Sequence, residues 1–537
     1  MNEPHNTVAP EMSGTSCDSD QPWPASPLCF NRQWLGGTKS LCVAIAAIIV
    51  YLLTYSPYWW IGLDSGLYLN LSRSLAEGHG YVTGGRPHTL VPPGFPLMLA
   101  GLMKLGLGSF AALNAVMLVF SLAAVWLCYR VLAMLVSRDW AVLLTCFVAL
   151  TREYVLASGE ILSDMPATVL VLASMWMYLK ACRSDKSRPA LWIAAGVLSL
   201  LSLTFRMALI PLSVGLALGA AIAGWRRQRL CSIASLAGVL AVMGVLAWLW
   251  FGYANANANA LSAPYTIQAS HAEGLAARTI SSILFAGGQL SRLVTGQRMP
   301  EAVCIVLLVI PVLLGMARRI KLGEWITPVA TLCYIGGLVI ATTKPRTRYL
   351  IPIAPLLVLQ LLEGYALIAG WLIRRRSGCA DSTQNASVQS CSAPNKIVIS
   401  LAAVMLAMNL ALVGRLIVDK HRSDFRTAQQ KGKYAYVWPV ADCLGALPAD
   451  GNVLAIQPVL YLAGREGPFL SGKLLRSTPA PDQMPELLNQ WNIRYVVCKP
   501  VKPDDPPFLN TLRQYMSQTG RLLMSSHGAE IYEVPLR

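Results

Sequence analysis

Charged side chains are scarce in this chain. Only 13% of its 537 residues are Asp, Glu, Lys or Arg, whereas 55% are hydrophobic. Soluble domains carry about 25% charged residues. Long apolar runs with few charges are instead typical of helices that cross a membrane. The composition therefore excludes an ordinary soluble protein and predicts a polytopic membrane protein embedded in the lipid bilayer.

Acidic residues are scarcer still than basic ones. The chain has 27 Asp and Glu against 44 Lys and Arg, which gives a formal net charge of +17. Such a charge can indicate a nucleic-acid partner, but here the basic residues lie in short clusters between apolar runs. The positive-inside rule requires this pattern of cytoplasmic loops. Topology explains most of the charge, and no nucleic acid is expected as a partner.

Three familiar signatures are missing. The sequence has no Cys-x-x-Cys pair, and most of its 13 cysteines lie inside apolar runs, where they serve as small hydrophobic residues. It has no Gly-rich strand–helix turn, which argues against a nucleotide-sugar donor. Its N-terminal segment, 1–38, is polar and rich in Ser and Pro, unlike a signal peptide, and is predicted to be a disordered cytoplasmic tail.

Apolar runs and the basic clusters between them define a membrane domain over 39–418. Arg32 and Lys39 precede the first run and place the N-terminus in the cytoplasm. About eleven spans are predicted, at roughly 40–60, 110–135, 139–153, 163–181, 190–205, 208–224, 231–252, 300–317, 325–342, 349–373 and 396–417. An odd number of spans puts the C-terminal region outside the inner (cytoplasmic) membrane.

Two long loops are predicted on the outer side, about 61–109 and 253–299. In the first, residues 64–77 repeat apolar positions at helical spacing, which predicts a helix lying along the membrane surface. A Pro-Pro-Gly-Phe-Pro turn then starts a second apolar helix, about 95–106, too short to cross the bilayer. The loops placed outside also carry the acids Asp64, Glu77, Glu153, Glu160, Asp164 and Glu273.

The pattern changes in the C-terminal segment, 419–537. Short apolar runs at 453–456, 495–498 and 530–534 are predicted strands, and 484–491 is a predicted helix that leads into the second strand. The expected fold class is therefore an all-α polytopic membrane domain followed by a small extracytoplasmic α/β domain.

Two acidic clusters at the outer boundary are candidates for chemistry. Asp64 follows the first span, with Tyr68 one helical turn later. A carboxylate at the membrane boundary is costly to desolvate, so a functional role is the default interpretation. Glu160 and Asp164 follow a break in an apolar run, and their spacing of four would place them on one face of a helical turn.

A basic cluster at the same boundary contradicts the positive-inside pattern. The span count puts Lys344, Arg346 and Arg348, followed by Tyr349, on the outer side. Arg206, at the outer end of the fifth span, is a second exception. Cations on the wrong side need a local reason, and binding of a phosphate or pyrophosphate is the natural one.

Each cluster has a structural alternative. Asp64 could cap the surface helix. Glu160 and Asp164 could form a solvated loop, with Asp164 capping the next helix, and the basic cluster could anchor lipid headgroups. His79 and His88 fit loop residues better than metal ligands. The placement of all three clusters on one side of the membrane favours a shared site.

The clusters belong to a series of short motifs. They are Asp64…Tyr68…Gly78-His79-Gly80-Tyr81…Pro92-Pro93-Gly94-Phe95-Pro96, then Glu160…Ser163-Asp164…Pro166, then Arg346…Arg348-Tyr349…Pro352…Pro355. In order and spacing this series resembles the GT-C superfamily of membrane glycosyltransferases, in particular the bacterial branch related to protein O-mannosyltransferases and lipid A aminoarabinose transferases. The resemblance covers roughly 40–360, together with the outer α/β tail.

The resemblance implies a polyprenyl-phosphate sugar as donor and Asp64 as the catalytic residue, because the family has its catalytic acid in the first outer loop. Many members carry an Asp-Glu pair there, whereas this chain has Asp64-Ser65, so Glu160 or Asp164 could supply a second acid. The donor phosphate would be bound by Arg346 and Arg348, helped by Lys344 and Arg206. Further site candidates are Tyr68, His88 and Tyr349.

We therefore expect an enzyme that transfers a hexosyl or pentosyl group, with inversion, to a hydroxyl of an extracytoplasmic acceptor in the cell envelope. Asp64 would act as the base on a glycan, lipid or protein acceptor. A divalent cation, Mg²⁺ or Mn²⁺, could bridge Asp64, Asp164 and the phosphate, although the sequence does not demand one.

Two other classes remain open at this stage. A polymerase or ligase that moves whole glycans between lipid carriers would use similar arginines. A transporter or flippase would place ionisable residues and broken helices in the middle of the membrane, whereas the predicted span centres are almost free of charge.

Overall fold

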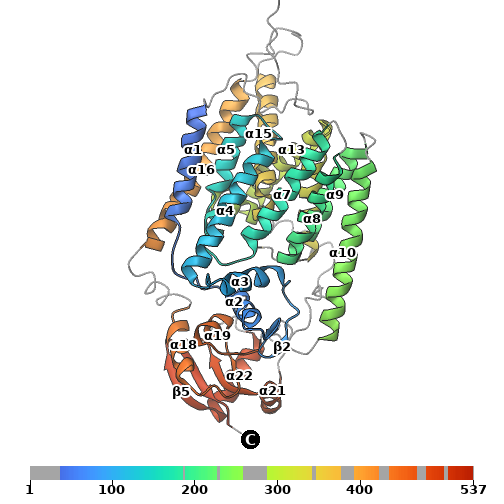
Figure 1. Ribbon diagram of the computed structural model, residues 1–537. Coiled ribbons are helices and arrows are strands. Elements are labelled where there is room, and N and C mark those ends of the chain that lie inside the picture. Colours follow the sequence, from blue (N-terminus) through green and yellow to red (C-terminus); the bar gives the residue numbers. More distant parts are fainter. Residues whose placement is uncertain are drawn as a thin grey trace, which may run out of the picture.

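The computed structural model describes residues 37–184, 188–225, 230–257, 287–341, 346–376, 392–421, 434–468, 479–500 and 506–535. Residues 1–36 of the predicted N-terminal tail, most of the predicted second outer loop and Lys344 lie outside these residues. Figure 1 shows a bundle of long helices above a smaller domain that contains the strands and the C-terminus.

The bundle contains the helices expected to cross the membrane, which lie side by side in Figure 1. They are α1 (Gly37–Leu53), α4 (Phe110–Leu132), α5 (Arg138–Ala149), α7 (Asp164–Arg183), α8 (Pro189–Phe205), α9 (Ile210–Trp225), α10 (Leu230–Ala256), α12 (Glu301–Cys304), α13 (Ile310–Lys321), α14 (Ile326–Ala341), α15 (Ala354–Arg376) and α16 (Ser392–His421). Short segments join or extend them: α6 (Arg152–Ala157), η1 (Met207–Leu209), the π-helical turn η2 (Ile305–Val309) and the 3₁₀ helix η3 (Thr347–Ile353).

Seven helices in the described part of the chain are long and apolar enough to cross a membrane. They start at Phe110, Asp164, Met207, Leu230, Glu301, Thr347 and Lys396. Each of the other predicted spans also falls on a helix, but a shorter one. The shortest is the 12-residue α5, which at 1.5 Å per residue reaches about 18 Å of a hydrocarbon core about 30 Å thick. A multi-pass helical protein is thus confirmed, whereas the number of crossings and their orientation stay predictions.

Close backbone packing holds part of the bundle together. A Cβ atom on Gly315 would lie 1.9 Å from the carbonyl oxygen of Gln360, and one on Gly364 equally close to the carbonyl oxygen of Pro311. Because lipid gives helices no hydrophobic reason to associate, such small residues let α13 and α15 approach and gain dispersion contacts.

One ion network lies inside the bundle. Arg319 donates from Nε and Nη2 to the two carboxylate oxygens of Glu363, at 2.9 and 2.7 Å, and Glu324 lies 3.5 Å from Arg319 Nη1. All three residues are buried. The expectation of nearly charge-free spans is therefore incomplete. These ions are retained because they neutralise one another locally.

The segment predicted to be the first outer loop forms the layer between the bundle and the lower domain (Figure 1). Its helices α2 (Leu63–Ala76) and α3 (Gly94–Lys104) lie where the surface helix and the short apolar helix were expected. Between them the two-residue strands β1 (Val82–Thr83) and β2 (Arg86–Pro87) form a hairpin that has no counterpart among the predicted elements.

The C-terminal domain contains a four-stranded sheet with the order β3-β4-β6-β5, in which only the β3–β4 pair is parallel. Strands β3 (Asn452–Leu454), β4 (Ile493–Cys498) and β6 (Ala529–Glu533) overlap the three predicted strands, whereas β5 (Arg521–Ser526) was not expected. The helices are α18 (Val437–Ala446), α19 (Gln457–Ala463), α21 (Met484–Gln490) and α22 (Pro507–Thr519). The boundary of this domain near 419 stays a prediction.

Candidate active site

Four charged side chains from distant parts of the sequence gather where the bundle meets α2. Asp64 lies in the first turn of α2, and Asp164 is the first residue of α7. Arg206 lies between α8 and η1, and Arg348 lies in η3. Two ion pairs form, Asp64 with Arg348 and Asp164 with Arg206. Asp164 also interacts electrostatically with Arg348, so the two pairs form one cluster.

The Asp64–Arg348 pair is the open one. Nη2 of Arg348 donates a hydrogen bond to Oδ2 of Asp64, and the two side chains are 24% and 45% exposed. The residue before α2 is Gly62, and no side chain caps that end of the helix. The carboxylate of Asp64 thus faces a guanidinium instead of capping the helix, and it remains accessible to solvent.

The Asp164–Arg206 pair is the closed one. The side chain of Asp164 is 3% exposed and that of Arg206 is 10% exposed, so Asp164 does not lie in a solvated loop. The expectation that Glu160 and Asp164 share a helical face is not met. Helix α7 begins at Asp164, and Glu160 lies in a bend before it, half-buried, with its carbonyl accepting from Leu162 N–H at 2.9 Å.

Tyr349 lies between the two arginines. The guanidinium carbons of Arg206 and Arg348 lie 4.7 and 5.8 Å from the centre of its ring, a cation–π arrangement. Its backbone carbonyl accepts from the hydroxyl of Tyr334 at 2.6 Å, and Tyr154 donates to the carbonyl of Ile351 at 3.0 Å. These buried hydroxyls fix η3, and with it the position of Arg348.

Tyr68 joins α2 to the start of α7. Its hydroxyl lies 3.1 Å from Oγ of Ser163, and its ring meets Phe95 edge-on at 4.9 Å. Burial raises the pKa of Tyr68 above its usual value of 10, because desolvation disfavours the phenolate. Tyr68 is therefore a neutral hydrogen-bonding group beside the cluster.

The remaining described candidates, His88 and Arg346, do not form the ion pairs of the cluster. His88 is buried in the 81–91 loop, where Nδ1 lies 3.3 Å from Thr83 Oγ1 and Nε2 accepts from the backbone N–H of Val91 at 3.3 Å. Burial lowers the pKa of His88 from 6.5 to about 3. These contacts fit the interpretation of His88 as a loop residue. Arg346 is exposed just before η3, and Lys344 lies outside the described residues.

The donor set of the cluster does not fit a divalent cation. Each carboxylate already faces a guanidinium, and the described residues contain no group of three or more His, Cys, Asp and Glu side chains that could hold a metal ion. A cation would meet the positive charge of two arginines before it met a third oxygen ligand.

Three residues of the site escaped the sequence analysis as contributors. Ser163 is adjacent to Asp164 in the sequence, so its position was visible but not its contact with Tyr68. Tyr154 and Tyr334 lie in apolar segments, where a tyrosine is interpreted as a large hydrophobic residue. The only signal was that a buried hydroxyl needs a partner.

Comparison with known proteins identifies proteins of similar fold. The family model for dolichyl-phosphate-mannose-protein mannosyltransferases matches residues 90–251. The crystal structure of ArnT from Cupriavidus metallidurans in the apo state aligns with a TM-score of 0.53 at 13% identity, covering 92% of this chain and 97% of ArnT. ArnT bound to undecaprenyl phosphate gives 0.51 at 12% identity, covering 93% and 98%.

A third similar structure is the oligosaccharyltransferase of Archaeoglobus fulgidus tethered to an acceptor peptide. Its TM-score is 0.50 at 11% identity, with 94% of this chain and 76% of that chain covered. No curated protein sequence matches the chain. The chain therefore has the fold of the GT-C superfamily of membrane glycosyltransferases, and the resemblance predicted from its motifs is confirmed.

Proposed function

We propose that this protein transfers a sugar from a polyprenyl-phosphate donor to a hydroxyl group of an extracytoplasmic acceptor. The observation that carries the proposal is the open ion pair between Asp64 and Arg348. Asp64 belongs to α2, which lies between the bundle and the C-terminal domain in Figure 1. The pair places a base and an anion-binding group side by side. ArnT, which shares the fold, has been crystallised with undecaprenyl phosphate, a donor carrier of the required kind.

The reaction is a single displacement at the anomeric carbon. Asp64 takes the proton of the acceptor hydroxyl while the acceptor oxygen forms a bond to C1 of the sugar. The bond between C1 and the phosphate oxygen breaks, and the polyprenyl phosphate leaves with the electron pair. Attack opposite the leaving group inverts the configuration at C1. General-base assistance of this kind contributes about 10²–10⁴-fold.

Arg348 links donor binding to activation of the base. Its planar guanidinium can bind a phosphate through two parallel hydrogen bonds. Its contact with Asp64, by comparison, uses a single carboxylate oxygen. When the donor phosphate engages Arg348, Asp64 loses its partner and becomes available to the acceptor hydroxyl. Negative charge that develops on the phosphate is then stabilised at the moment of bond breaking.

The closed pair has a supporting role in this scheme. Asp164 keeps Arg206 in place, and Arg206 in turn contacts the ring of Tyr349 next to Arg348. Arg346 adds positive charge two residues before Arg348, and Lys344 is proposed to assist donor binding. No step is assigned to Glu160 or His88, and none is routed through a metal ion.

The test is sugar transfer by the purified full-length protein in lipid nanodiscs. Radiolabelled polyprenyl-phosphate monosaccharides serve as donors and envelope extract as acceptor. Wild type should transfer one donor, Asp64→Asn should lose most of the activity, and the exposed control Asp482→Asn should keep it. Turnover should be the same in EDTA. An Asp64→Asn protein that is folded and turns over at the wild-type rate would overturn the proposal.

A further inference from the structure

Helix α2 contacts the bundle with one face and the C-terminal domain with another. Asp64 and Tyr68 contact Arg348 and Ser163 of the bundle. Asn70 and Arg73 instead contact α19 of the C-terminal domain. At 3.6 residues per turn, positions 70, 73 and 77 lie on the side of the helix opposite positions 64 and 68. The side away from the candidate active site is therefore reserved for the C-terminal domain.

The seam between α2 and α19 is tight at its inner end. A Cβ atom on Gly66 would lie 2.7 Å from the backbone nitrogen of Pro458, so only glycine fits there. The side-chain nitrogen of Asn70 donates to the backbone carbonyl and the side-chain oxygen of Gln457, at 3.0 and 2.7 Å. These contacts hold the C-terminal domain in a defined position against α2.

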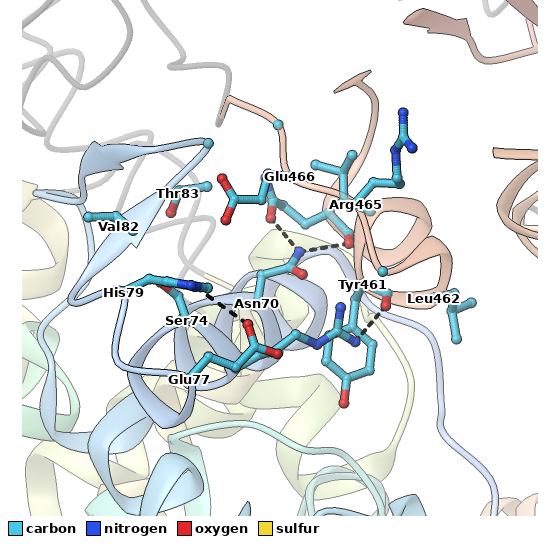
Figure 2. Close-up of a pocket in the computed structure, with 16 residues that line it drawn as sticks. Asn70, Ser74, Glu77, His79, Val82, Thr83, Tyr461, Leu462, Arg465 and Glu466 are labelled. Carbon is cyan, nitrogen blue, oxygen red and sulfur yellow. Dashed lines mark hydrogen bonds and ion pairs between the residues drawn. The ribbon is translucent and has the colours of Figure 1, made fainter. Parts of the chain in front are cut away.

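The seam opens beyond Asn70 into a cavity of about 510 Å³, which we call the seam pocket. Figure 2 shows its walls, with Glu77 from the end of α2, Thr83 from β1, and Tyr461 and Glu466 from α19 and the segment after it. The hairpin tip closes one rim, since a Cβ atom on Gly84 would lie 2.6 Å from the carbonyl carbon of Gly467. The volume is within the range of small-molecule sites, about 300–1,000 Å³.

The arginines of the seam pocket are engaged by the protein. Nη2 of Arg73 donates to the carbonyl of Tyr461 at 2.6 Å, and its guanidinium carbon lies 4.0 Å from the centre of that ring. Arg465 donates to the carbonyls of Leu447 and Pro448, at 3.2 and 2.6 Å. Both guanidinium groups therefore have hydrogen-bond partners within the protein.

The two carboxylates of the seam pocket, in contrast, are exposed to the cavity. Glu77 and Glu466 are exposed and reach into the pocket from opposite walls (Figure 2). His79 Nδ1 lies 3.5 Å from Glu77 Oε2. Two acids and two arginines leave the lining without net charge, so it selects neither a polyanion nor a polycation. Carboxylates accept hydrogen bonds without donating any, which suits a neutral ligand rich in hydroxyl donors.

We propose that the seam pocket binds a neutral saccharide unit of the extracytoplasmic acceptor. This inference rests on the proposed function for the identity of the acceptor, but not for the binding itself. Asn70 and Glu77 follow Asp64 by six and thirteen residues, or about 9 and 20 Å along the helix axis. The pocket therefore holds a sugar remote from the reacting hydroxyl and positions the acceptor through the opposite face of the same helix.

Binding is tested with purified full-length protein in nanodiscs by saturation-transfer NMR. The probes are the β-1,4-linked disaccharide of N-acetylglucosamine, maltose and an α-linked mannose disaccharide, with inorganic phosphate as the anionic probe. We expect at least one disaccharide to bind wild type and Asp64→Asn equally. Glu77→Gln combined with Glu466→Gln should weaken that binding at least tenfold, whereas the exposed control Glu486→Gln should not.

Several outcomes would overturn the inference: no disaccharide binds, phosphate binds the pocket in preference, or the double variant binds as wild type does. Loss of saccharide binding in Asp64→Asn would show that the saccharide binds at the open ion pair and not in the seam pocket. Kinetics separate the two proposals. The pocket variants should raise the acceptor KM with donor KM unchanged, while failure of every variant and of wild type to consume donor would count against the proposed function alone.

Discussion

Two acid–arginine pairs of the same chemistry lie in one cluster, but they differ in their access to water. Asp64 is 45% exposed, whereas Asp164 is 3% exposed. A half-exposed pair contributes little to stability, because water competes for both partners. A buried pair cannot lose one partner without leaving an uncompensated charge. The open pair can therefore exchange its partner for a ligand, and the closed pair has to remain intact.

The difference follows from the place in the fold of the helix that carries each acid. Asp64 lies in a helix on the outside of the bundle, between it and the C-terminal domain. Asp164 begins α7, which packs against α4, α8 and α9 inside the bundle. Substitutions should therefore separate the pairs: changes in the open pair should reduce turnover in a stable protein, and changes in the closed pair should reduce stability first.

The largest effect is expected for Asp64→Asn. Removal of the base should lower kcat about 10²–10⁴-fold, while donor KM and the unfolding temperature change little. Steady-state transfer from the donor identified for wild type, together with thermal unfolding in detergent, measures both quantities. A large fall in unfolding temperature would show that Asp64 is also structural, which would remove the contrast between the pairs.

Asp164→Asn should give the opposite result. It leaves the guanidinium of Arg206 buried without a counter-ion, which should destabilise the fold by about 3–5 kcal/mol. The double variant Asp164→Asn with Arg206→Met should regain most of that stability, because no charge is then left unpaired. Thermal unfolding of wild type, the two single variants and the double variant tests this cycle. If Asp164→Asn is stable yet loses turnover as Asp64→Asn does, Asp164 has a direct chemical role.

Arg348→Ala should lower turnover about 10²–10³-fold, since the departing phosphate loses a preorganised donor. Arg348→Lys should recover only part of this loss, because an ammonium group cannot form the two parallel hydrogen bonds of a guanidinium. Arg521→Ala, which removes an exposed arginine of β5, is the control. Combining Arg348→Ala with Asp64→Asn should cost less than the sum, because the two residues act on one displacement.

The contrast between open and closed groups extends to His88. Because burial lowers its pKa from 6.5 to about 3, the imidazole ring of His88 stays neutral in the folded state. The unfolded chain takes up a proton as pH falls below 6.5, so stability is complete above that pH and is lost progressively towards pH 3. At pH 5 the loss should be about 2 kcal/mol. His88→Gln should flatten this part of the pH profile of unfolding, with turnover at pH 7.5 nearly unchanged.

The sequence revealed the polar members of the site because polar residues stand out in an apolar chain. Asp64, Asp164, Arg206 and Arg348 were all identified in this way. Their pairing was not predictable, since Asp64 and Arg348 are 284 positions apart and only the tertiary fold brings them together. The start of α7 did have a local signal: Pro166 favours the first turn of a helix, which places Glu160 outside it.

Hydrophobic periodicity explains which helices and strands could be predicted from the sequence and which could not. Long apolar runs and the 64–77 pattern located most helices to within a few residues, although α1 ends at Leu53 and not near 60. Strands of two residues, such as β1 and β2, are too short to show alternation, and β5 has a polar outer end, Ser525–Ser526, that hides it. The seam between α2 and α19 depends on side-chain complementarity between Asn70 and Gln457, which no single-sequence pattern records.

The smallest effect is expected for Arg346→Ala. Arg346 precedes Arg348 by two residues but is exposed, so its attraction to a donor phosphate is screened by water and salt. An exposed charge contributes about 0.2–1 kcal/mol, which corresponds to no more than about a fivefold rise in donor KM. Raising the salt concentration to 0.5 M should remove the difference from wild type. An Arg346→Ala protein that is as inactive as Arg348→Ala at any ionic strength would contradict this prediction. It would show that the donor phosphate binds to the exposed Arg346. Solvent exposure, and not the pairing of Arg348 with Asp64, would then determine which arginine binds the phosphate.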